Sequence, residues 1–178
     1  LLNILDLLRS GHLDGLNITI PYKSFIVKYL DQITDSARKI GAVNCIMLRG
    51  NQIIGSNTDW IGFKKLLDLH KILVDGKKVI LIGIGGVARS VIYTLRNLGV
   101  SDIKVFNRTI SKKVEICSEH IDLISLDKIG DFIEKDSIII NSSSVGMTDY
   151  KSPFCASYLN NSQIIIDAIY KIGGTKLI

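Results

Sequence analysis

A glycine-rich turn is the first place in this chain where residue types and spacing could do chemistry. The apolar run at residues 79–82 is typical of a buried strand, and Gly83, Gly85 and Ala88 follow it with the spacing G-x-G-x-x-G/A. In this motif the first glycine makes a tight turn, the second lets the backbone approach a pyrophosphate, and the small third residue lets a helix pack on the strand. The anion lies at the helix N-terminus, where free N–H groups favour negative charge. The motif indicates a dinucleotide site, although a glycine turn without a nucleotide has the same spacing.

The end of the next predicted strand indicates which dinucleotide is bound. NAD-binding units carry Asp or Glu about 20 residues after the turn, where the carboxylate accepts a hydrogen bond from the ribose 2′-hydroxyl. Here the strand runs into Asn107, Arg108 and Thr109, with Lys112 one turn beyond, and no carboxylate stands at that end. A guanidinium, a hydroxyl and an ammonium group suit a 2′-phosphate, so the expected cofactor is NADP. The alternative interpretation is a basic surface cluster that caps a helix.

A second group of polar side chains lies near the N-terminus. Residues 15–20 alternate between apolar and polar types, which predicts a strand whose apolar residues, Ile20 included, face a core. Asn17 and Thr19 then project together from the other face. A proline ends the strand, and Lys23 follows at the start of the next predicted helix. An amide, a hydroxyl and an ammonium group are therefore expected to converge at one strand end.

The elements that must position these groups follow from the hydrophobic pattern. Strands that alternate with helices predict an α/β fold whose parallel sheet has helices on both faces, and ligands of such sheets bind at the carboxyl ends of the strands. Helices are predicted over residues 1–10, 24–30, 35–40, 60–70, 86–98 and 112–119. Strands are predicted over residues 15–20, 45–49, 52–54, 78–82, 102–106, 121–124, 137–141 and 163–167.

Composition excludes several classes of protein. The chain has 178 residues, 47% of them hydrophobic, and no apolar run is as long as a membrane span. Its three cysteines are far apart, which favours neither a disulfide framework nor a metal site and fits a reducing cytoplasm. The net charge of +5 comes from scattered lysines, so nucleic acid is not an expected partner. A monomer or a homodimer is expected. The chain opens inside an amphipathic pattern without Met, as a piece of a longer protein would.

Several segments, in their order and intervals, resemble the shikimate dehydrogenase family. The resemblance covers nearly the whole chain and rests on residues 15–23, 40–44, 55–59, the Gly83 turn, 107–109 and 141–147. It implies an NADP-linked oxidoreductase that interconverts 3-dehydroshikimate and shikimate, in the pathway to aromatic amino acids. It also implies a substrate-binding α/β lobe over residues 1–72 and a Rossmann-type NADP-binding domain over residues 73–178.

The resemblance implies a role for individual residues. Lys23 matches the catalytic lysine of the family and Asp59 its carboxylate partner, and reduction of a ketone by hydride needs such a proton source as an alkoxide develops. Asp59 could otherwise act only as a helix N-cap. The implied substrate-binding residues are Asn17, Thr19, Asn44 and Tyr170, of which Tyr170 could equally be a packing residue. The implied cofactor-binding residues are Gly83, Gly85, Gly86, Val87, Ala88, Asn107, Arg108, Thr109, Lys112, Gly146 and Met147.

The sequence also departs from the family. The first strand with two substrate-binding serines, the last strand of the nucleotide domain and the closing helices are not found in these 178 residues. Two alternatives to a shikimate dehydrogenase therefore stay open. One is a quinate/shikimate dehydrogenase relative of broader specificity, and the other is a catalytically silent NADP-binding module.

Overall fold

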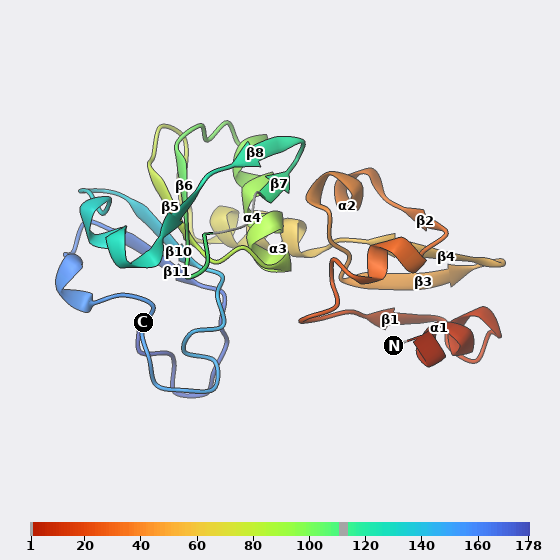
Figure 1. The fold of residues 1–178 in the computed structure, drawn as a ribbon. Helices are drawn as coiled ribbons and strands as arrows, with labels where there is room; N and C mark the ends of the chain where they lie inside the picture. Colours follow the sequence, from red (N-terminus) through yellow and green to blue (C-terminus); the bar gives the residue numbers. More distant parts are fainter. Residues whose placement is uncertain (1, 111–113) are drawn as a thin grey trace.

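The chain folds around two separate β-sheets. The computed structural model describes residues 2–110 and 114–178. Figure 1 shows one sheet built from the N-terminal third of the chain and a second, larger sheet built from the remainder, with two helices, α3 and α4, between them. Within the described ranges, no helix is long and apolar enough to span a membrane.

The first sheet has four strands in the order β1-β3-β4-β2. Strands β1 (Gly15–Asn17), β3 (Cys45–Arg49) and β4 (Gln52–Ser56) are antiparallel neighbours, and β2 (Gln32–Ile33) runs parallel to β4. The sheet packs against α1 (Leu2–Arg9), and α2 (Asp35–Ile40) lies at its end near α4. Helix α2 begins where the Thr34 hydroxyl accepts a hydrogen bond from the Ala37 N–H, and it ends at Gly41, whose φ of 70° lies in the left-handed region.

The second sheet is fully parallel, with strand order β11-β10-β5-β6-β9. It contains β5 (Val79–Ile82), β6 (Ile103–Asn107), β9 (Leu123–Ser125), β10 (Ile138–Asn141) and β11 (Ile164–Asp167). Strands β5 and β10 are buried along their whole length, which explains their continuous apolar runs. The predicted α/β fold with a Rossmann-type parallel sheet is confirmed.

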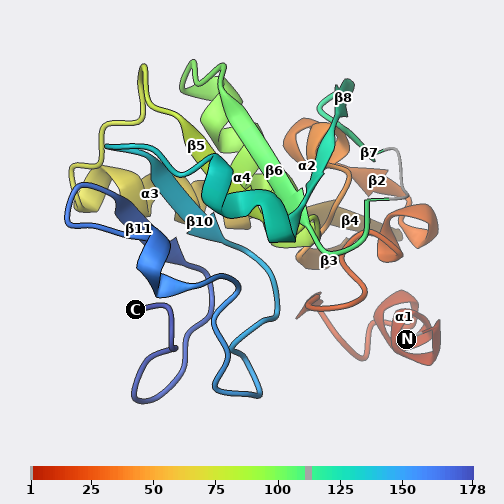
Figure 2. The ribbon, with the colours of Figure 1, turned by 60° about the vertical axis from the view of Figure 1, so that its left-hand side comes forward.

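The two faces of this sheet are covered differently. Helices α3 (Asp59–Leu69) and α4 (Gly86–Asn97) bury Leu67, Val91 and Leu95 against one face. The other face packs against the 3₁₀ helix η2 (Leu126–Asp131) and Phe154, just before the short 3₁₀ helix η3 (Ala156–Tyr158). Among the described residues, the expected α-helices on both faces are therefore found on one face only. Figure 2 shows η2 running across the sheet face opposite α4.

Helix α3 joins the two sheets. It follows β4 directly, and its Trp60 ring meets the Tyr93 ring of α4 edge to face with 5.5 Å between centroids. The Thr94 hydroxyl of α4 also donates to the Trp60 carbonyl at 3.2 Å. A division of the chain at residues 72 and 73 would separate the two sheets and leave α3 packed across the division. This boundary stays a prediction.

Three further sequence predictions differ from the structure. The predicted helix over residues 112–119 is wrong where the chain is described: β7 (Val114–Ile116) and β8 (Glu119–Ile121) form a hairpin, turned by Cys117 and Ser118 at φ 56° and 62°. Residues 24–30 form only the 3₁₀ helix η1 (Ile26–Tyr29). Ile20 is 59% exposed, because β1 ends at Asn17 and the chain then turns away from the sheet.

Candidate active site

Lys23, in the turn before η1, forms an ion pair with Asp59, the first residue of α3. The Lys23 Nζ donates to Asp59 Oδ2 at 2.7 Å, and the two side chains are only 12% and 23% exposed. Asp59 Oδ1 accepts a second hydrogen bond, from Asn44 Nδ2, at 2.8 Å. Each carboxylate oxygen therefore has its own donor, and one lysine, one carboxylate and one amide form a connected polar group.

Backbone contacts explain why these residues meet. The Val43 N–H donates to the Lys23 carbonyl at 2.7 Å, which fixes the lysine beside the segment that ends in Asn44. The Thr58 N–H donates to Asn44 Oδ1 at 2.8 Å, and Asp59 begins α3 immediately afterwards. Three segments distant in sequence are held together by these hydrogen bonds.

The glycine turn lies directly beside this pair. Gly83 has a φ of 98°, and a Cβ there would come within 3.0 Å of the Ser143 backbone nitrogen, so the position requires glycine. Gly85 precedes α4, and a Cβ on it would meet no atom within 4 Å. A Cβ on Gly86 would lie 2.9 Å from Cδ of Lys23. The lysine stem therefore rests on the first residue of α4.

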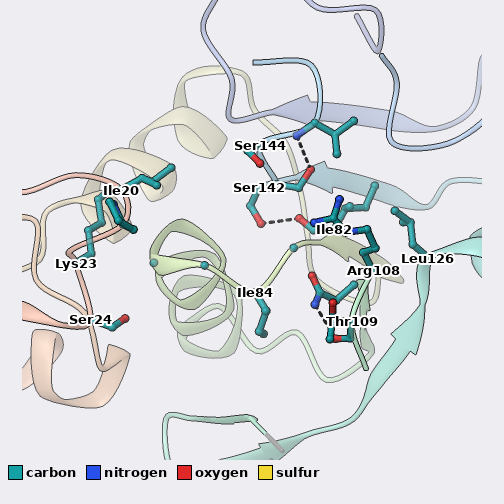
Figure 3. A pocket seen from close by; sticks show the side chains of 17 residues that line it. Ile20, Lys23, Ser24, Ile82, Ile84, Arg108, Thr109, Leu126, Ser142 and Ser144 are labelled. Carbon is teal, nitrogen blue, oxygen red and sulfur yellow. Dashed lines mark hydrogen bonds between the residues drawn. The ribbon is translucent and has the colours of Figure 1, made fainter. Parts of the chain in front are cut away.

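A cavity of about 460 Å³ opens above the turn (Figure 3). It lies at the carboxyl ends of β5, β6 and β10, where ligands of parallel sheets bind. Figure 3 shows Lys23 and Ile20 on one side of the start of α4, and Arg108 and Thr109 on the other. The open space at Gly85 and the exposed Arg108 guanidinium fit a pyrophosphate and a further phosphate. The donors present therefore suit a phosphorylated dinucleotide such as NADP.

A second cavity of about 640 Å³ adjoins the first. Thr19, Thr58, Asp59, Met147 and Tyr170 are among its lining residues. Four residues line both cavities, namely Ile20, Lys23, Ser142 and Ser143. The Lys23–Asp59 pair thus faces a space large enough for a small molecule next to the space that suits a dinucleotide.

The structure brings most of the predicted site residues to these cavities. Those that line a cavity are Thr19, Lys23, Asp59, Gly83, Gly85, Gly86, Val87, Asn107, Arg108, Thr109, Met147 and Tyr170. Asn44 lines neither cavity but contacts Asp59, while Ala88 is fully buried behind the turn. Asn17 is exposed in β1 and Gly146 is buried in its loop, and neither lines a cavity. Lys112 lies outside the described residues.

The Tyr170 side chain is 99% exposed although the residue lines the second cavity. Such exposure does not fit a residue whose role is to pack in the protein interior. The three histidines are exposed. In the described part of the chain, His, Cys, Asp and Glu side chains form no group of three that could hold a metal ion.

Four polar residues that the sequence analysis did not select belong to the site region. Thr58 bonds to Asn44, while Ser142 and Ser143 follow β10 and line both cavities. Asn57 is 2% exposed and accepts a hydrogen bond from the Asp59 N–H. Asn side chains just before a helix often accept a hydrogen bond from a backbone N–H two residues later, so the sequence could have indicated this contact of Asn57.

Arg89 on α4 reaches the first lobe, the part of the chain that forms the first sheet. Its Nη1 donates to the Glu115 carbonyl of β7 at 3.1 Å and lies 3.4 Å from the Ile40 carbonyl at the end of α2. Burial lowers the pKa of the Arg89 guanidinium from its ordinary value, because desolvation disfavours the charged form. The guanidinium remains charged and joins three elements around the site.

Comparison with known proteins identifies the family. A model described as the shikimate dehydrogenase substrate binding domain matches residues 1–46, and a model described as shikimate/quinate 5-dehydrogenase matches residues 67–152. A shikimate dehydrogenase (NADP(+)) from Oceanobacillus iheyensis is 34% identical over 169 residues, which cover 92% of this chain and 61% of the relative.

Solved structures agree with these matches. Shikimate dehydrogenase 1 from Peptoclostridium difficile superposes with a TM-score of 0.88 at 32% identity, covering 98% of this chain and 64% of that one. The Thermus thermophilus shikimate 5-dehydrogenase, solved with NADP(H) and shikimate, gives a TM-score of 0.74 at 26% identity, covering 94% and 62%. The chain thus spans somewhat less than two thirds of these relatives. Two domain models, a close sequence relative and the shared fold agree that this chain belongs to the shikimate dehydrogenase family.

Proposed function

We propose that the protein to which this chain belongs catalyses the NADP-dependent interconversion of 3-dehydroshikimate and shikimate, with proton transfer by Lys23 and Asp59. The observation that carries the proposal is the position of the Lys23–Asp59 pair, which lies at the junction of the two cavities. Family membership and the relatives named as NADP(+)-dependent enzymes support the same activity.

The cofactor and the residues of the site have different roles in the proposed reaction. NADPH, when bound, supplies the hydride that reduces the substrate carbonyl. The Lys23 ammonium has three protons and uses one in its bond to Asp59, so it can donate another to the carbonyl oxygen as negative charge develops there. Asp59 holds the ammonium in place and stabilises its charge at this partly buried position.

The cofactor site is assigned to the first cavity. Gly85 leaves room for the pyrophosphate at the N-terminus of α4, Gly86 belongs to the same turn, and Arg108 with Thr109 would bind the 2′-phosphate. Lys112 belongs to the same proposed cofactor set. Arg108→Asp is expected to weaken NADPH binding much more than NADH binding, and an equal loss for both would contradict the assignment.

The substrate site is assigned to the second cavity. Thr19 and Tyr170 provide hydroxyl groups at its wall, and Met147 contributes an apolar surface. Asn44 already uses its amide group on Thr58 and Asp59, so a bond from Asn44 to a substrate hydroxyl would have to replace one of these. Asn17, also proposed to bind substrate, belongs to the first-lobe strand that leads to this cavity.

The test is an assay of NADPH-dependent reduction of 3-dehydroshikimate, followed by nicotinamide absorbance. Lys23→Ala is expected to abolish turnover and to leave NADPH affinity nearly unchanged, because the side chain lies beside the cofactor site without forming its anion-binding part. Equal turnover by Lys23→Ala would refute the role of the lysine. A wild-type protein that binds NADPH but does not reduce the substrate would indicate the silent NADP-binding module.

The second candidate is a quinate/shikimate dehydrogenase of broader specificity. It is favoured by the description of the family model that matches residues 67–152, which names both substrates. Oxidation of quinate and shikimate, each with NADP⁺ and with NAD⁺, distinguishes the two candidates. The basic Arg108 predicts a preference for NADP⁺ in both cases.

A further inference from the structure

A buried amide lies directly behind the Lys23–Asp59 pair. The Asn57 side chain donates through Nδ2 to the Ala42 carbonyl at 3.0 Å, and its Oδ1 accepts from the Asp59 N–H at 3.0 Å. The Ser90 hydroxyl can donate to Oδ1 of Asn57 or to the Gly86 carbonyl, each at 3.2 Å. Because a backbone carbonyl only accepts and a backbone N–H only donates, these partners fix the orientation of the amide. Asn57 and Ser90 are 2% and 1% exposed, so water cannot replace a lost partner.

The three partners of Asn57 belong to three different parts of the site. Ala42 precedes Val43, whose N–H holds the Lys23 carbonyl. Asp59 is the carboxylate of the pair. Ser90 lies on α4, one helical turn after the glycine that contacts the lysine stem. One side chain therefore connects the backbone next to the lysine, the backbone of the aspartate and the helix that begins at the dinucleotide turn.

We propose that Asn57 is a positioning residue, which holds Asp59 and the segment beside Lys23 in register with α4. The proposal rests on the proposed function, because it assumes that the pair transfers a proton at the cofactor site. Loss of the amide leaves the Asp59 N–H and the Ala42 carbonyl buried without partners, and the segments that carry them must then shift to recover hydrogen bonds. Such a shift separates the carboxylate from the ammonium.

The chain contains a matched control one turn further along α4. Thr94 is 1% exposed, and its hydroxyl donates to the Trp60 carbonyl of α3 at 3.2 Å or to the Ser90 carbonyl at 2.9 Å. Thr94→Val therefore removes a buried hydrogen-bonding group between α3 and α4 without touching the Lys23–Asp59 pair. Asn57→Ala and Thr94→Val should both lower the melting temperature, Asn57→Ala by more because it leaves two backbone groups without partners.

The expected result separates positioning from stability. Asn57→Ala should lower kcat about 100-fold with the KM for NADPH unchanged, because misplacement of a catalytic group by about 1 Å costs that much. Asn57→Ser, whose hydroxyl can accept from the Asp59 N–H, should recover part of the rate. Thr94→Val should retain the wild-type kcat. Equal losses of kcat in Asn57→Ala and Thr94→Val would overturn the proposal.

A second measurement does not depend on turnover. The rate at which an acylating reagent modifies Lys23, followed by peptide mass spectrometry, reports how firmly Asp59 holds the amine. We expect faster modification in Asn57→Ala and an unchanged rate in Thr94→Val. A wild-type protein without dehydrogenase activity would refute the proposed function, whereas equal modification rates in wild type and Asn57→Ala would refute the positioning role of Asn57.

Discussion

Gly86→Ala tests whether the cofactor helix sets the position of the proposed catalytic lysine. Gly86 is the first residue of α4, and the added methyl group would lie 2.9 Å from Cδ and 3.1 Å from Cβ of Lys23. The methyl would point at the lysine rather than into the cofactor space. The substitution therefore perturbs one side chain of the first lobe from a backbone position in the second.

The size of the effect follows from these distances. Carbon atoms in contact lie about 3.5–4.0 Å apart, so Cδ of Lys23 must move by about 0.6–1 Å. The Nζ to Asp59 Oδ2 bond, now 2.7 Å, would then exceed a normal hydrogen-bond length of about 3.2 Å. A displacement of about 1 Å at a catalytic group costs about 100-fold in rate. Alanine is a better helix former than glycine by about 0.5–1 kcal/mol, which offsets part of the crowding.

The assay compares Gly86→Ala with Gly85→Ala. A methyl group on Gly85 meets no protein atom within 4 Å and lines the cofactor cavity, so it should weaken NADPH binding. Gly86→Ala should instead lower kcat, with nearly unchanged NADPH affinity and melting temperature. A Gly86→Ala enzyme with wild-type kcat, or one that loses NADPH affinity as Gly85→Ala does, would refute the reasoning.

Three further predictions concern stability and thiol reactivity. Gly62→Ala in α3, where a Cβ meets no atom within 4 Å, should raise the melting temperature by about 2–4 °C in thermal denaturation; an unchanged value would indicate hidden strain. A hydrogen bond from the Ile53 N–H, together with one from Arg9, lowers the pKa of Asp31 in the folded protein. The ionised Asp31 carboxylate therefore stabilises the fold at a pH above its unfolded pKa, and this stabilisation is lost as the pH falls below about 4. Urea unfolding of Asp31→Asn should show a shallower loss of stability on acidification than wild type. A hydrogen bond from the Ser157 hydroxyl lowers the pKa of the Cys155 thiol, whereas burial raises the pKa of the Cys117 thiol. Iodoacetamide should therefore modify Cys155 before Cys117, which peptide mass spectrometry would measure.

The parallel sheet could be predicted from the sequence because burial on both faces leaves a strong signal. Strands β5 and β10 are short apolar runs bounded by polar or glycine residues, and the structure has them within one residue of the predicted ranges. The hairpin at β7 and β8 left no comparable signal. Its turn residues Cys117 and Ser118 adopt left-handed conformations usually taken by Asn and Gly, and the strands are only three residues each.

The site could be predicted in part for a related reason. The glycine turn has a signal in its own residue types and spacing, whereas the roles of Lys23 and Asp59 are predicted only through the resemblance of the segments around them to the family. Asn57 and Ser90 act through buried contacts between segments 33 residues apart, which only the packing of α4 against the first lobe brings together. The alternation of apolar and polar residues predicts that Ile20 lies in the core, but this pattern continues beyond the end of β1 at Asn17, and Ile20 is exposed.

Three parts of the surface of helix α4 make different contacts. Its N-terminus faces the cofactor cavity, and Val91 with Leu95 packs in the core of the parallel sheet. Gly86 and Ser90, four residues apart, form a third stripe, which contacts the lysine stem and Asn57. Because the apolar face fixes the rotation of the helix on the sheet, it also fixes where this stripe meets the first lobe. We therefore expect the core packing of the second lobe to set the distance between the glycine turn and the Lys23–Asp59 pair proposed to transfer the proton.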